Sequence, residues 1–232
     1  MTKETLILTA VHGDEAFSIP IVEKLKSKFN FDSIVANPQA LTENQRYLEA
    51  DLNRSGPGNP DSKLLEERLA FRLIQTGSEY QQVIDIHGAE SDCGIFIILG
   101  DPNWKNIELA KNLDIGKVVL WPGLLPTGPL CQFIPNSLEI QCGPKNSPQV
   151  AQDLEKVLNS FFEGETRQEP QQFFIVTGRL SGLDPKGFKD FEEASVDGIK
   201  FFPLFPGLYP GIACCMMQKL NNDLSFSNLM IK

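Results

Sequence analysis

The chain has 232 residues, of which 22% are charged and 41% hydrophobic, a composition typical of a soluble globular protein with a substantial core. Its formal net charge of -9 argues against a nucleic-acid or anionic-membrane partner, because both bind a basic protein surface. The short apolar run near the N-terminus is flanked by acidic residues, unlike a signal peptide, and no stretch approaches a transmembrane helix in length. Five cysteines, two of them adjacent, predict no disulfide framework and favour a reducing cytoplasm.

Apolar runs alternate with helical spacing along the first 162 residues. The runs predict strands at Thr5–Val11, Ser33–Ala36, Gln82–Ile86, Gly94–Leu99, Lys117–Trp121 and Ser137–Gln141. The helical spacing predicts helices over Ala16–Phe29, Ser62–Gly77, Asn103–Leu113 and Pro148–Phe162. Between Gln39 and Asp61 there is no period and much glycine and proline, which predicts a long ordered loop of the kind that is usually functional. The alternation as a whole predicts an α/β fold with helices on both faces of the sheet.

The pattern changes after Phe162, where a polar linker, Gly164–Gln172, begins. The remaining apolar runs are short, rich in β-formers and broken by glycine and proline: Phe173–Val176, Ile199–Phe205, Ile212–Met217 and Leu224–Ile231. We therefore predict two domains, an α/β domain of residues 1–163 and a small β-rich domain of residues 164–232.

The two histidines of the chain, His12 and His87, each follow the carboxyl end of a predicted buried strand. Binding sites of open α/β sheets gather at that edge. Glu15, at the start of a predicted helix, can bend toward the same point. Two histidines and a glutamate, with a fourth position left for water, are a usual ligand set of catalytic zinc. The alternative is a hydrogen-bonded histidine and a glutamate that complements the helix dipole.

Two further features carry possible chemistry. Arg46, Asn53 and Arg54 lie in the long loop and suit recognition of a carboxylate, because a guanidinium binds it with two parallel hydrogen bonds. The alternative is a solvated loop built of ordinary turn residues. Glu139 places a carboxylate within an apolar strand, where burial of its charge is costly. It is then either half of a salt bridge or a base beside a metal.

Six pieces of sequence, in order from about Thr5 to Pro144, together resemble the succinylglutamate desuccinylase/aspartoacylase family, which is related to the zinc carboxypeptidases. They are His12-Gly13-Asp14-Glu15, Asn37-Pro38 with Ala40, Arg46-Tyr47, Asp51-Leu52-Asn53-Arg54, Asp85-Ile86-His87, and Glu139 with Gly143-Pro144. The resemblance implies a zinc carboxypeptidase-like three-layer α/β/α catalytic domain with a mixed sheet, followed by a small β-rich domain.

The resemblance also implies a zinc-dependent deacylase that cleaves the amide bond of a small N-acyl amino acid, such as N-acetylaspartate or N-succinylglutamate. It implies one zinc ion per subunit, with these ligands: His12, Glu15 and His87. Arg46 is similar to the residue that polarises the scissile carbonyl, and Asn53 and Arg54 to the clamp on a substrate carboxylate. Glu139 is similar to the general base, and Asp85 to a residue that orients a ligand from behind.

The sequence departs from the family pattern at the segment before Glu139. Gly123–Pro135 contains no arginine or lysine, whereas aspartoacylases place an arginine there for the second carboxylate, so N-acetylaspartate is in doubt. Tyr209 corresponds only loosely to a tyrosine that the family uses near the substrate. A zinc carboxypeptidase acting on a peptide C-terminus, and a metal-binding protein whose catalysis has lapsed, are the alternatives. A homo-oligomer is left open.

Overall fold

A computed structural model describes residues 3–122, 126–165, 167 and 169–220. The strands are β1 (Lys3–Thr9), β2 (Asp32–Val35), β3 (Tyr80–Gly88), β4 (Gly94–Leu99), β5 (Lys117–Leu120), β6 (Ser137–Gly143), β7 (Gln172–Ser181), β8 (Ala194–Val196), β9 (Ile199–Leu204) and β10 (Ile212–Lys219). The helices are α1 (Ile19–Lys26), α2 (Pro38–Thr42), α3 (Leu65–Gly77), α4 (Trp104–Lys111), α5 (Leu130–Phe133) and α6 (Pro148–Glu163), with short 3-10 turns η1 (Ala16–Ser18) and η2 (Leu52–Arg54). No helix in these described ranges is long and apolar enough to cross a membrane.

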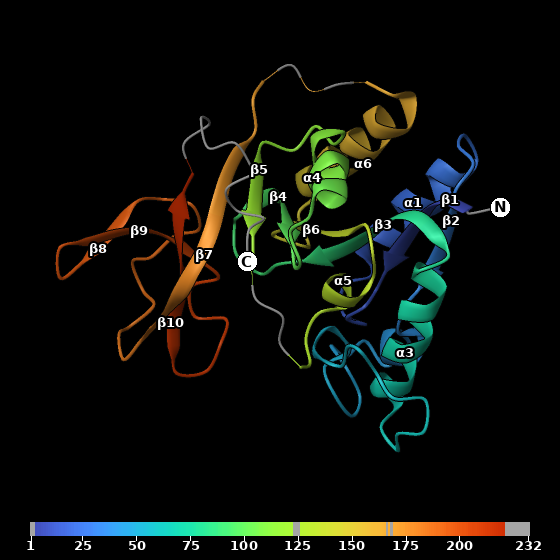
Figure 1. Cartoon of the computed structure of the whole chain (residues 1–232), viewed down its shortest axis with the longest axis horizontal. Coiled ribbons are helices and arrows are strands. Elements are labelled where there is room, and N and C mark those ends of the chain that lie inside the picture. Colours follow the sequence, from blue (N-terminus) through green and yellow to red (C-terminus); the bar gives the residue numbers. More distant parts are fainter. Residues whose placement is uncertain (1–2, 123–125, 166, 168, 221–232) are drawn as a thin grey trace.

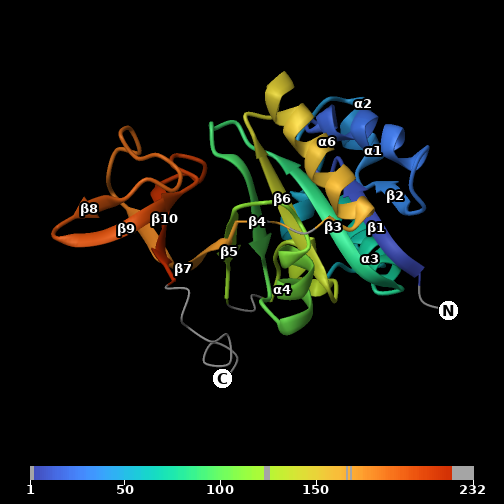
Figure 2. The ribbon, with the colours of Figure 1, turned by 90° about the horizontal axis from the view of Figure 1, so that it is seen from above.

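The strands form one mixed sheet of ten strands in the order β2-β1-β3-β6-β4-β5-β7-β10-β9-β8. The pairs β2–β1, β1–β3 and β3–β6 are parallel, whereas β4 runs antiparallel to β6. Beyond β4 the chain adds β5 and β7 in parallel and then an antiparallel ribbon of β10, β9 and β8. Figures 1 and 2 show this ribbon extending away from the helices. The predicted mixed α/β fold is confirmed.

Helices cover both faces of the first half of the sheet, because the central strands are apolar on both sides. On one face Ile7 and Ile84 cluster with the buried side chains of α1 and α6. On the other face Leu6 and Val83 cluster with those of α3 and α5. Successive residues of a strand point to opposite faces. His87 is four residues after Val83 on β3, so it points to the same face, the side of α3 and α5.

Helix α6 illustrates how local sequence sets an element's bounds. The Ser147 hydroxyl accepts a hydrogen bond from the backbone N–H of Val150 at 3.4 Å, and Pro148 occupies the first helical position, where its missing N–H costs nothing. The helix ends at Gly164, whose φ of 73° is the left-handed conformation that glycine adopts without strain. The helix predicted over Pro148–Phe162 is therefore confirmed to within one residue.

Other elements differ from the prediction. The segment Gln39–Asp61 holds helix α2 and turn η2 as well as loop, and α5 and β8 were not predicted. The strand predicted at Leu224–Ile231 lies outside the described residues. Strand β7 pairs with β5, so the predicted β-rich domain shares the sheet of the larger one, and its separation into a domain stays a prediction.

Candidate metal centre

The two histidines meet at the carboxyl ends of the neighbouring parallel strands β1 and β3. His12 lies in the turn that follows β1, and His87 is the second-last residue of β3. Their ring centroids are 5.0 Å apart, and the two residues are 3% and 1% exposed. Two segments 75 positions apart in sequence, the difference between 87 and 12, therefore deliver their imidazoles to one buried point.

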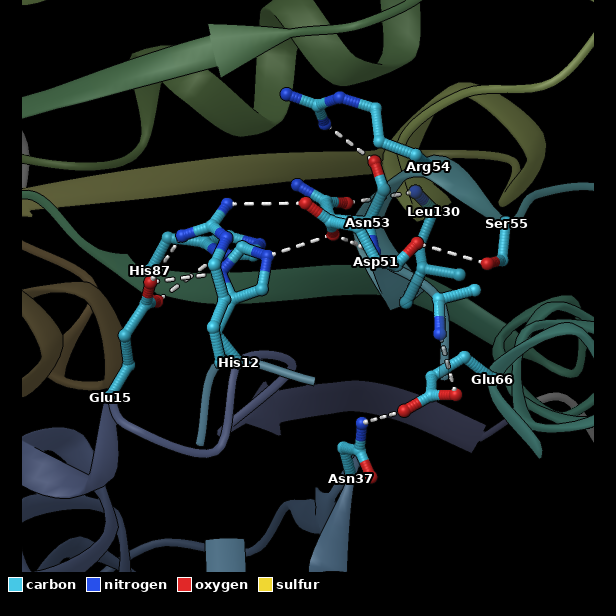
Figure 3. Close-up of polar contacts among 12 residues, drawn as sticks. His12, Glu15, Asn37, Asp51, Asn53, Arg54, Ser55, Glu66, His87 and Leu130 are labelled. Carbon is cyan, nitrogen blue, oxygen red and sulfur yellow. Dashed lines mark hydrogen bonds and ion pairs between the residues drawn. The ribbon is translucent and has the colours of Figure 1, made fainter. Parts of the chain in front are cut away.

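Glu15 completes the group from the residue before turn η1. Its Oε1 lies 2.8 Å from His12 Nδ1, and its Oε2 lies 3.3 Å from His87 Nδ1 (Figure 3). The backbone N–H of Gly88 donates to Oε2 at 2.7 Å and fixes the carboxylate. One ligand atom from each of the three residues lies within 4.8 Å of the others, close enough to share one ion.

A second carboxylate stands behind each imidazole. Asp51 Oδ1 lies 3.1 Å from His12 Nε2, and Asp85 Oδ2 lies 3.1 Å from His87 Nε2. Both Nδ1 atoms are thereby left to face Glu15. Histidines that bind a metal commonly hydrogen-bond a carboxylate through the other ring nitrogen, which fixes the ring and raises its basicity. Asp51 was not singled out as a metal-site residue, although it begins the Asp51–Arg54 motif.

The carboxylates of the centre raise the pKa values of its histidines, and the histidines lower the pKa of Glu15. Burial alone would lower the pKa of His12, but its hydrogen bonds to Asp51 and Glu15 outweigh burial and leave the pKa raised. The pKa of His87 is raised well above its usual range, because Asp85 and Glu139 outweigh burial. Burial would raise the pKa of Glu15, but its hydrogen bonds with the two histidines hold it far below its usual range. Burial raises the pKa of Asp85, which His87 only partly offsets.

These residues fit a divalent metal ion. Among the described residues, both ring nitrogens of His87 and both carboxylate oxygens of Asp85 are buried without a well-aligned hydrogen bond. Buried polar atoms of this kind need a partner, and an ion is one explanation. Two imidazole nitrogens and a carboxylate are the donor set of catalytic zinc sites. His12, Glu15 and His87 would hold the ion, with Asp51 and Asp85 orienting the rings.

The three predicted loop residues lie around this centre. The Arg46 guanidinium is 3.6 Å from Glu15 Oε1 and 3.4 Å from Asp51 Oδ2, and its side chain is 40% exposed, which leaves it able to meet a ligand. The carbonyl of Asn53 accepts a hydrogen bond from Arg54 Nη1 at 2.6 Å. The Asn53 side chain accepts from the backbone N–H of Leu130 at 3.2 Å, which ties turn η2 to helix α5.

Glu139 lies on β6, further from the carboxyl end of the strands than the residue that pairs with His87. In the β3–β6 register it pairs with Asp85, whereas Gln141 pairs with His87. The Gln141 side-chain amide donates to Glu139 Oε1, and the Asn53 side-chain amide donates to Oε2 at 3.4 Å. Glu139 therefore belongs to the Nε2 side of His87, beside Asp85. Gln141 was not singled out from the sequence, although the period of two places it on the same strand face as Glu139.

Tyr209, from the loop before β10, reaches the predicted carboxylate clamp. Its hydroxyl accepts a hydrogen bond from Arg54 Nη2 at 3.0 Å, and the guanidinium carbon lies 5.9 Å from the centre of the ring. The β-rich C-terminal part of the chain therefore contributes a contact to this side of the centre.

A model of the succinylglutamate desuccinylase/aspartoacylase catalytic domain matches residues 1–120 of the chain. The chain belongs to this family. A probable aspartoacylase of Acaryochloris marina is 31% identical over 131 residues, which are 48% of this chain and 43% of that protein. A probable aspartoacylase of Prochlorococcus marinus (strain MIT 9515) is 29% identical over 177 residues, 67% of this chain and 58% of that protein. The chain thus matches about half the length of these curated relatives.

Solved structures share the fold of this chain. A succinylglutamate desuccinylase from Chromobacterium violaceum superposes with a TM-score of 0.72 at 16% identity, covering 94% of this chain and 85% of that one. Murine aminoacylase 3 gives a TM-score of 0.73 at 15% identity, covering 94% and 96%. The six sequence motifs pointed to the same family.

Proposed function

We propose that this chain is a zinc-dependent amidohydrolase that removes the acyl group from a small N-acyl amino acid. The observation that carries the proposal is the meeting of His12, Glu15 and His87 around one buried point, each imidazole backed by a carboxylate. We propose one zinc ion per subunit. The five cysteines are all free and buried, which is consistent with the proposed cytoplasmic location.

Each remaining residue has a task in this reaction. Bound zinc would supply a Lewis acid and a water of lowered pKa. Arg46 would donate to the carbonyl oxygen as negative charge develops there. Asn53 and Arg54 would hold the substrate carboxylate. Glu139 would take the proton of the attacking water as the C–O bond forms, and pass it to the amine nitrogen as the C–N bond breaks.

The substrate class follows from what surrounds the clamp. Arg54 offers one guanidinium for one carboxylate, and the segment 123–135 adds no cationic side chain. N-Acyl amino acids with one carboxylate near the amide therefore fit better than N-acetylaspartate, while N-succinylglutamate remains in the test panel. The contact of Tyr209 with Arg54 favours a small substrate over the C-terminus of a long peptide, because it covers one side of the clamp.

The test is metal analysis of the purified protein combined with turnover of a panel of substrates. We expect zinc to approach one ion per chain, and chelation to abolish turnover that zinc restores. The panel contains N-acetylaspartate, N-succinylglutamate, other N-acyl amino acids and a dipeptide. Faster hydrolysis of the dipeptide would make the chain a carboxypeptidase. Zinc binding without turnover of any member would identify a metal-binding protein whose catalysis has lapsed.

A further inference from the structure

Glu66, in the first turn of α3, is a fully buried carboxylate whose side chain takes no part in the chemistry described above. It is 0% exposed, and within the described ranges no lysine, arginine or histidine forms an ion pair with it. Burying an unpaired carboxylate is costly unless hydrogen bonds satisfy its oxygens. Its hydrogen-bond partners therefore show how the fold accommodates a carboxylate here.

The partners are consecutive backbone amides of the loop between Arg46 and Asp51. The N–H of Leu48 donates to Oε1 at 2.8 Å, that of Glu49 to Oε2 at 3.2 Å, and that of Ala50 to Oε2 at 3.1 Å. The side chain of Asn37 adds a donor at 3.4 Å, as Figure 3 shows. Successive amides that converge on one anion form a pocket that fixes the backbone around it.

The loop also contacts the start of α3 through a side chain of its own. The Glu49 carboxylate accepts a hydrogen bond at 2.5 Å from the backbone N–H of Leu65, the first residue of α3, whose preceding residue provides no side-chain cap. The loop and the start of the helix thus cap each other. The side chains of Tyr47 and Leu48 are exposed, at 41% and 38%, so apolar burial does little to hold this loop.

The residues on either side of the three amides touch the metal centre. Asp51 contacts His12 Nε2, while Arg46 contacts Glu15 and its carbonyl accepts from the N–H of Gly13 at 3.2 Å. Asn53 is held at two points: its side chain accepts from the N–H of Leu130, and its own backbone N–H donates to Asp51 Oδ1 at 2.9 Å. A change at Glu66 should therefore disturb Arg46 and Asp51 most, and should reach the carboxylate clamp only through Asp51.

We propose that Glu66 is a positioning residue that holds the 46–51 loop through the amides of residues 48–50, and thereby fixes Arg46 over the centre and Asp51 behind His12. This inference deepens the proposed function, and its kinetic test rests on that function. Glu66 then acts mainly on the chemical step and on the metal, with a smaller effect on binding of the substrate carboxylate.

The experiment compares Glu66→Gln with Glu67→Gln, which removes the same charge from the same helical turn at a half-buried neighbour. In the wild-type protein we expect the amides of residues 48–50 to be protected from hydrogen exchange, although the side chains of Leu48 and Glu49 are exposed. We expect Glu66→Gln to lose at least about tenfold of that protection. Its zinc affinity should fall about tenfold, in the range for loss of an outer partner of a ligand. Glu67→Gln should match the wild type in both.

The kinetic arm uses the substrate that the panel identifies. Glu66→Gln should lower kcat about tenfold or more and change KM by a smaller factor, because the Asn53 side chain keeps its bond to the N–H of Leu130 even where Asp51 is disturbed. Equal losses in Glu67→Gln, or a rise in KM alone, would overturn the inference. So would free exchange of the three amides in the wild-type protein, a measurement that needs no folded variant. If no panel member is turned over, the proposed function fails, while exchange and zinc affinity still decide the role of Glu66.

Discussion

At the scale of single residues, the position of the proposed base, Glu139, depends on two neighbouring residue pairs of the β3–β6 register. Glu139 pairs with Asp85, and Gln141 pairs with His87. The side chains of Glu139 and Gln141 point to the same face of the sheet, and the Gln141 amide donates a hydrogen bond to the Glu139 carboxylate. A base must come within hydrogen-bond reach of the proton that it takes, and the residue pair that contains His87 is nearer to the proposed metal ligands than the pair that contains Glu139.

We predict that Glu139→Gln lowers kcat about 100-fold or more, the usual effect of losing a general base, while zinc content is unchanged. The double variant Glu139→Gln/Gln141→Glu keeps both residue types and moves the carboxylate to position 141, which pairs with His87. It should restore kcat to the wild-type value or above. Steady-state kinetics and metal analysis of the three proteins decide this. Undiminished turnover by Glu139→Gln alone would show that Glu139 is not the base.

Binding of zinc should release protons, because both imidazoles of the centre have raised pKa values in the metal-free protein. An ion needs neutral imidazoles, so each protonated ring must lose its proton on binding. The apparent affinity should therefore fall as the pH is lowered through these pKa values. In the metal-free protein the protonated imidazoles stabilise the fold below the reference pKa of 6.5, and this stability is lost as the pH rises through the raised values.

The measurement is calorimetric titration of chelator-stripped protein with zinc, in buffers that differ in ionisation enthalpy. We expect release of about one proton or more per ion near neutral pH, because the raised pKa values favour protonated imidazoles in the metal-free protein. An affinity independent of pH, with no proton released, would contradict the arrangement of His12 and His87 as ligands.

At the scale of elements, the sequence predicts best where one periodicity is unbroken. The strand predicted at Gly94–Leu99 is β4 to the residue, because its apolar run ends in a turn on either side. Helix α5 is missed because its four residues are fewer than one and a half helical turns and show no period. Helix α2 is missed for the same reason, although Asn37 caps it by accepting from the N–H of Ala40.

The candidate site divides in a similar way. His12, Glu15 and His87 could be chosen from the sequence, because each stands at the carboxyl end of a strand or the start of a helix, where local pattern fixes position. The roles of Asp51 and Gln141 could not be assigned from the sequence, because they depend on the packing of a loop against His12 and on the β3–β6 register. Register is a long-range property that one strand's own pattern does not contain.

At the scale of the whole molecule, the sheet continues from the helix-covered part into the β-rich part. Strand β5 pairs with β7 along its outer edge, and Phe174 of β7, 2% exposed, packs in one cluster with Phe96 and Val119. The change in composition after Phe162 therefore marks where the helices stop, and the core extends across it. Whether residues 1–163 form an independent domain then depends on the free energy of unfolding of that fragment by itself.

We predict that the fragment of residues 1–163 is less stable than the full chain by more than about 3 kcal/mol, because losing Phe174 alone resembles an aromatic-to-alanine change in a core. The bare edge of β5 should also make it self-associate. Urea denaturation, gel filtration and zinc titration measure this. A full chain cut by a protease site inserted after Gly164, with both pieces kept, is the control and should remain folded. A monomeric fragment that unfolds cooperatively and binds zinc would instead establish 1–163 as an independent domain, since only a unit with its own complete core behaves in that way.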